Sequence, residues 1–198
     1  MYYRDYQNVR DAVWRILIDC GVNELPINLN KICKKLGVRV YRYESLKSFP
    51  AWLQRTDGAV FFQNGDPVIL YDQSKSVGRI RFTVAHELGH LVLGHIVPGQ
   101  RTTVNREPEP TDHPVETAAN QFAARLLAPA CVLWGLGVHT SEEIMVLCNI
   151  SKQAAEFRAD RMDILYQRDK FLLSSLEREV YQQFRPFIQG HHLPHSEE

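Results

Sequence analysis

The segment that most constrains this chain is residues 84–95, VAHELGHLVLGH, in which polar side chains stand among apolar ones. Together with the residues before it, this segment has the apolar spacing of one helix over about 77–94. Residues four apart in an α-helix differ by about 40° around the axis, so His86 and His90 project side by side. The two imidazoles can therefore bind one metal ion.

Glu87 stands about 100° from His86 around the same helix, so its carboxylate can reach a water on the metal without becoming a ligand. Zinc lowers the pKa of a bound water toward about 7, and a neighbouring carboxylate can accept its proton during attack on a carbonyl group. The apolar surroundings favour a metal site, because buried polar groups cost free energy unless they are coordinated or hydrogen-bonded. Two core histidines beside an exposed glutamate are the alternative interpretation.

A catalytic zinc normally has three protein ligands and one open position. A metzincin would have Gly at 93 and a third His at 96, but the chain has Leu93 and Ile96, which excludes that class. Glu116 opens an alanine-rich helix 26 residues after His90, as in zincins that take a glutamate from a second helix. We expect Asn120, one turn further along, to orient Glu116 by a hydrogen bond.

Other residues compete for the third position. The segment 96–113 is rich in proline and is expected to hold ligands less rigidly than a helix does. Its competing ligands are Glu107, Glu109, Asp112 and His113. His95 follows His90 by five residues, and its side chain would point to a different face if the helix continued. We interpret His95 as a histidine at the helix end in preference to a metal ligand.

The remaining patterns predict an α+β fold. Asn28 can cap a short helix that ends at Gly37, and the Asn64-Gly65 pair between two β-rich runs is typical of a hairpin turn. We expect helices over about 5–20, 29–36, 77–94, 114–127 and 174–184, two short helices between 140 and 162, and strands at 38–43, 58–62 and 67–71. Three units follow: a zincin-like domain over 1–137, a helix-turn-helix-like pair over 138–168, and a C-terminal helix and tail over 169–198.

The helix-turn-helix-like pair makes DNA binding a rival function. Residues 140–171 contain six acidic and five basic side chains, and the whole chain has 23 of each. A DNA-binding face needs clustered Lys and Arg, so DNA binding is disfavoured. We expect the pair to pack on the metal-binding domain and to help form the substrate groove.

No apolar run reaches the roughly 18 residues that span a bilayer, and the N-terminal residues MYYRDYQNVR lack the apolar core of an export signal. We therefore expect a cytoplasmic protein without a membrane partner. Its four cysteines are far apart in apolar patterns, which predicts reduced core residues.

Two linked segments resemble the ImmA/IrrE family of metallo-endopeptidases. They are RFTVAHELGHLVLGH at 81–95 and ETAANQFAARLLAP at 116–129. The segment LPINL at 25–29, the LGV that follows it at 36–38 and the hairpin are also similar, so the likeness covers about 5–165. The family often has Met where this chain has Ala128, a difference that leaves the chemistry untouched.

The resemblance implies a zincin-like α+β domain, with a small sheet packed against the motif helix and the third-ligand helix. It also implies that His86, His90 and Glu116 bind zinc and that Glu87 is the general base. Characterised members of the family cleave a helix-turn-helix transcriptional repressor that controls mobile elements or stress responses, so the resemblance implies a substrate of this kind. A non-catalytic regulator with a structural zinc remains the second possibility. The cleaved bond, the oligomeric state and the physiological metal are left open.

Overall fold

The computed structural model describes residues 3–45, 56–98 and 113–191. Three of the competing ligands, Glu107, Glu109 and Asp112, lie outside these residues, and only the backbone of His113 is described. Within these ranges, no helix is both long and apolar enough to cross a membrane.

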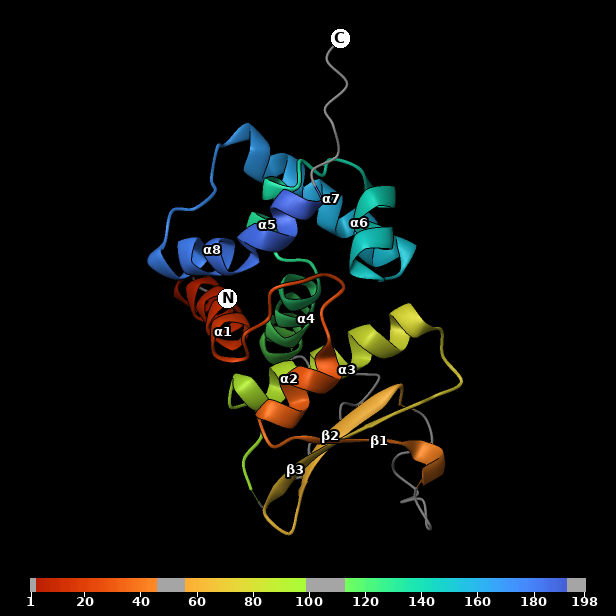
Figure 1. The fold of residues 1–198 in the computed structure, drawn as a ribbon. Helices are drawn as coiled ribbons and strands as arrows, with labels where there is room; N and C mark the ends of the chain where they lie inside the picture. Colours follow the sequence, from red (N-terminus) through yellow and green to blue (C-terminus); the bar gives the residue numbers. More distant parts are fainter. Residues whose placement is uncertain (1–2, 46–55, 99–112, 192–198) are drawn as a thin grey trace.

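The protein has the predicted α+β class (Figure 1). The helices are α1 (Tyr3–Asp19), α2 (Leu29–Lys35), α3 (Val77–Val92), α4 (His113–Leu127), α5 (Ala130–Gly135), α6 (Ser141–Cys148), α7 (Lys152–Gln167) and α8 (Ser175–Gly190). The strands are β1 (Arg39–Arg42), β2 (Gly58–Gln63) and β3 (Asp66–Tyr71), and the 3-10 turn Tyr43–Ser45 follows β1.

The described strands form one sheet in the order β1-β3-β2. Strands β2 and β3 are the predicted antiparallel hairpin, and Asn64 and Gly65 in its turn both have positive φ, 54° and 88°. Strand β1 pairs parallel to β3. Because side chains alternate along a strand, Val60 and Ile69 enter the main core whereas Leu70 joins a second cluster on the other face.

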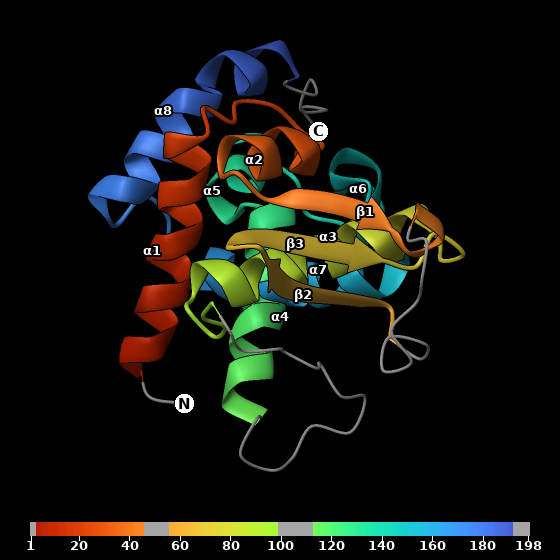
Figure 2. The same cartoon turned by 90° about the horizontal axis from the view of Figure 1, so that it is seen from below.

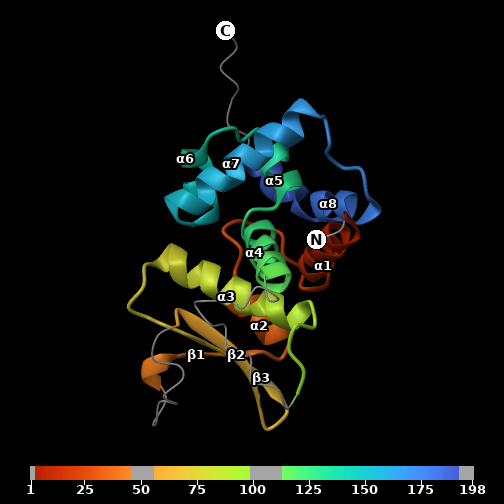
Figure 3. The ribbon, with the colours of Figure 1, turned by 180° about the vertical axis from the view of Figure 1, so that it is seen from behind.

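Helix α3 lies at the centre of the molecule, with the sheet on one side and α4 on the other (Figures 1 and 3). In the view from below, the sheet lies in front of α3 (Figure 2). The side chain of Ser76 caps the helix by accepting from the amide of Arg79 at 3.4 Å. Residues 83–90 of the helix are buried, which places His86, Glu87 and His90 inside the protein.

The C-terminal half contains more helix than the sequence predicted. Helix α4 ends at Leu127, as predicted, but Pro129 just beyond it is the N-cap of α5, which the sequence did not predict. Helix α7 continues to residue 167, and α8 passes Pro186 to residue 190. Val180, Phe184 and Ile188 recur every four residues of α8 and are all buried, and this packing outweighs the loss of one backbone hydrogen bond at Pro186.

One hydrophobic core joins the three predicted units, with Val13 of α1, Phe122 of α4, Ile144 of α6 and Phe184 of α8 among its members. Gln183 of α8 also donates to the carbonyl oxygens that close α1, including that of Leu17 at 2.8 Å. The four cysteines are buried and free, as predicted.

Candidate metal centre

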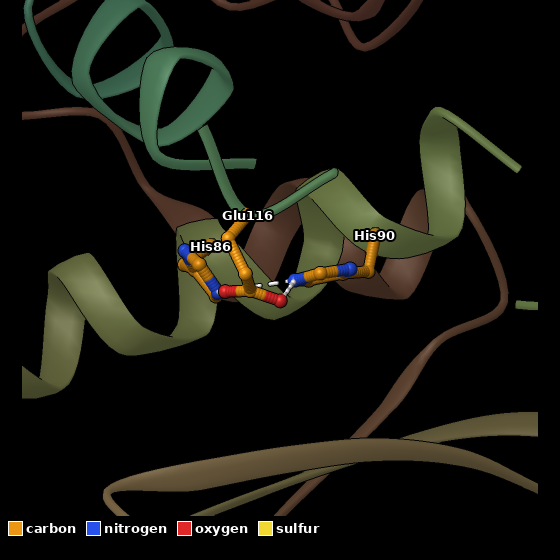
Figure 4. Close-up of side chains that lie close together, drawn as sticks. All are labelled: His86, His90 and Glu116. Atoms are coloured by element: carbon orange, nitrogen blue, oxygen red, sulfur yellow. Dashed lines mark hydrogen bonds and ion pairs between the residues drawn. The ribbon is translucent and has the colours of Figure 1, made fainter. Parts of the chain in front are cut away.

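The side chains of His86 and His90 from α3 meet that of Glu116 from the first turn of α4 (Figure 4). The Nε2 atoms of the two histidines are 3.0 Å apart. The Glu116 oxygens lie 3.3 Å from Nε2 of His86 and 3.4 Å from Nε2 of His90. Ligand atoms about 2.0–2.1 Å from a tetrahedral zinc are roughly 3.3 Å from one another. These residues therefore fit an ion of this size.

The charges of the three side chains are interdependent. Burial lowers the pKa of His86, but the hydrogen bond with Glu116 and the charge of Glu87 raise it more, so the net pKa is raised. Burial and the charge of His86 lower the pKa of His90. Burial alone would raise the pKa of Glu116, yet the two histidines bring it below its usual value.

Asn120 lies against His86, where its Oδ1 is 2.9 Å from Nδ1 of the imidazole. We expected Asn120 to orient Glu116, and the structure shows His86 as its hydrogen-bond partner instead. An amide oxygen only accepts hydrogen bonds, so this contact holds the proton on Nδ1 and leaves the Nε2 lone pair of His86 for a metal. Asn120 thus positions a candidate ligand on the neighbouring helix.

His95 folds back onto His90, with their Nδ1 atoms 3.3 Å apart and their ring centroids 5.2 Å apart. The expectation that His95 points to a different face assumed a continuing helix. The helix ends at Val92, and Gly94 turns the chain with a φ of +71°. A glycine just after the last helical residue was the sequence signal for this turn.

The carboxyl group of Glu87 is buried beside this cluster, with 2% of the residue exposed. Burial raises its pKa to about 7, although the charge of His86 opposes the shift. Its Oε2 has no hydrogen-bond partner among the residues described here. A buried carboxyl oxygen without a partner is costly and is typical of a functional site.

Two glycines allow the elements around the site to approach closely. A Cβ at Gly89 would lie 3.1–3.2 Å from the side chain of Phe122 on α4. A Cβ at Gly58, where β2 begins, would overlap Thr83 and lie 3.5 Å from Cγ of Glu87. The strand and both helices therefore enclose the cluster.

Comparison with protein families gives an independent assignment. The family model described as the IrrE N-terminal-like domain (Peptidase_M78) matches residues 33–160. This region is more than half of the 198 residues and contains both helices of the cluster, α6 and the first part of α7. Comparison with curated proteins gave no match. The chain therefore belongs to the Peptidase_M78 family of metallopeptidases, which accounts for its zincin-like α+β fold.

Proposed function

We propose that this protein is a zinc-dependent endopeptidase in which His86, His90 and Glu116 hold the metal. The observation that carries the proposal is the set of three ligand atoms within 4.8 Å of one another beside the buried, unpartnered carboxyl of Glu87. Two imidazoles and one carboxylate form the donor set of a catalytic rather than a structural zinc. This composition favours the peptidase over a regulator with structural zinc.

A zinc ion held there would supply a Lewis acid and a bound water with a pKa near 7. Glu87 acts as the general base, because its free oxygen can accept the proton of the attacking water. The same carboxyl then returns the proton to the leaving amine. Asn120 and His95 act through the ligands that they contact, His86 and His90.

We further propose that the substrate is a helix-turn-helix transcriptional repressor and that cleavage takes place in the cytoplasm. The support for both is the resemblance of the two motifs to the ImmA/IrrE family. The DNA-binding alternative loses one basic side chain in the fold, since Arg158 of the α6–α7 pair is 7% exposed and is not available to phosphates. A gel shift that weakens as salt rises would support that alternative.

The test is to incubate the purified protein with helix-turn-helix repressors encoded near its gene, with and without a chelator. Cleavage should require the metal and should be lost in Glu87→Gln. Glu156→Gln, which changes an exposed glutamate on α7, is the matched control and should cleave normally. Full cleavage by Glu87→Gln would remove Glu87 as base. A full cellular effect of that variant without cleavage would favour the non-catalytic regulator.

A further inference from the structure

A cavity of about 420 Å³ lies beside the metal centre, between α3, α4 and α7. Its walls are mostly apolar and include Phe82, Ala124, Ile150, Ala154 and Phe157. Binding sites for small ligands in proteins have similar volumes, about 300–1,000 Å³, and a mainly apolar lining with a few polar groups. The cavity therefore suits an apolar group larger than a methyl.

The wall of this cavity is shared with the candidate metal centre. Asn120 lines the cavity and also bonds the imidazole of His86. Phe82, one helical turn before His86, lines it from α3, with its ring centroid 6.4 Å from that of the imidazole. A group bound in the cavity would thus lie next to His86, one of the proposed metal ligands.

The α6–α7 pair is docked firmly enough to form the opposite wall. A Cβ at Gly78 of α3 would lie 2.8 Å from the backbone nitrogen of Ser151 in the turn between the two helices. Arg81 of α3 also donates to the carbonyl oxygen of Cys148 at 3.3 Å. Near these contacts, Phe157 of α7 is 70% exposed, although a large aromatic side chain gains free energy from burial.

We propose that this cavity, the α3–α7 pocket, binds a large apolar side chain of the substrate, such as Leu, Met or Phe, next to the scissile bond. The proposal rests on the peptidase function, because the metal centre places the scissile bond. The pocket shares Asn120 with the hydrogen bond that orients His86, so a group in the pocket would lie beside the metal centre at which the peptide binds. We therefore assign a side chain of the bound peptide as the occupant. The α6–α7 pair then contributes to substrate specificity instead of binding DNA.

The experiment measures binding, so it does not depend on turnover. The zinc-loaded protein is titrated calorimetrically with peptide hydroxamates that differ in one side chain, which is methyl, isobutyl, benzyl or carboxyethyl. The isobutyl and benzyl compounds should bind at least about tenfold more tightly than the methyl compound, because they bury additional apolar carbon atoms. The carboxyethyl compound should show no such gain.

Variants that fill the pocket from two helices identify the site. Ala154→Leu on α7 and Ala124→Leu on α4 should each bring the ratio of the isobutyl to the methyl affinity close to one. Gln153→Leu places the same side chain on an exposed position of α7 outside the pocket, and it should keep the ratio of the unmodified protein. If one of these two pocket variants fails to fold, the affinity ratio of the other still tests the pocket.

Equal affinities across the series would overturn the pocket while leaving the metal centre intact. If the protein takes up no zinc and binds none of the hydroxamates, the peptidase function is contradicted. In that case the pocket is tested alone, by titrating the metal-free protein with N-acetyl-leucine amide. The signal followed is the methyl resonance of Ala154. A shift that Ala124→Leu removes would support the pocket, and an unchanged resonance would overturn it.

Discussion

The Nδ1 atom of His86 lies 2.9 Å from the side-chain oxygen of Asn120, so a residue on α4 fixes the orientation of a candidate ligand on α3. The contact links the two helices that together supply the candidate metal ligands. It also determines which nitrogen of His86 faces Glu116 and His90.

Replacing Asn120 with Ala should lower the affinity for zinc by about 10- to 100-fold, because the imidazole loses the acceptor that holds its ring and its tautomer. Competition with a chromophoric chelator measures this change. Asn120→Asp keeps an acceptor oxygen and should retain most of the affinity. Equal affinities in the Ala variant and the unmodified protein would show that the hydrogen bond has no role in metal binding.

His95→Ala should also weaken zinc binding, by about tenfold, since His90 loses the partner of its Nδ1 atom. The same competition assay applies, with circular dichroism to confirm the helix content. His191→Ala, at an exposed histidine after α8, is the control and should bind zinc normally. The role of His95 would be refuted by an affinity equal to that of this control.

Gly89→Ala should reduce the free energy of unfolding by about 1 kcal/mol or more, because the new methyl group overpacks against Phe122. Phe122 is fully buried, and its Cβ is among the atoms at 3.1–3.2 Å, so it has little room to move. This cost opposes the higher helix propensity of alanine. Urea denaturation measures the difference.

The matched variant for this prediction is Gly190→Ala at the end of α8, where a Cβ would meet nothing within 4 Å. It should change stability by less than about 0.5 kcal/mol. A Gly89→Ala protein at least as stable as the unmodified one would mean that the close approach of α3 and α4 is not required.

Zinc affinity should fall as the pH decreases, and the decline should begin above pH 6.5. Zinc needs the unprotonated Nε2 of His86, and Glu116 and Glu87 together raise the pKa of this histidine above its ordinary value of 6.5 despite its burial. Protons therefore compete with zinc below this raised pKa, whereas at higher pH the competition vanishes. Dissociation constants between pH 8 and 5.5 test this, and a constant affinity over that range would contradict it.

The grouping of the three candidate ligands could be predicted from sequence because their arrangement depends on local geometry. The i, i+4 spacing of His86 and His90 fixes their relation once a helix is predicted, and Glu116 stands at the start of a second strongly helical pattern. The Asn-Gly hairpin was predictable for the same reason. In each case a short segment contains all the information.

Features that depend on how distant segments pack could not be read in this way. The sequence pattern does not specify the crossing of α3 and α4, which puts Asn120 against His86 instead of Glu116. The parallel pairing of β1 with β3 and the continuation of α8 past Pro186 are likewise tertiary effects. His95 was misplaced because the predicted helix was extended through Gly94.

The most direct test of the central claim measures zinc content and cleavage of the proposed helix-turn-helix repressor substrate in the same preparation of Glu87→Gln. The account predicts one zinc per chain, as in the unmodified protein, with cleavage slower by at least about 100-fold, since proton transfer by a positioned base contributes that much or more. Cleavage at the unmodified rate, or an unmodified protein that cleaves without bound metal, would contradict the account.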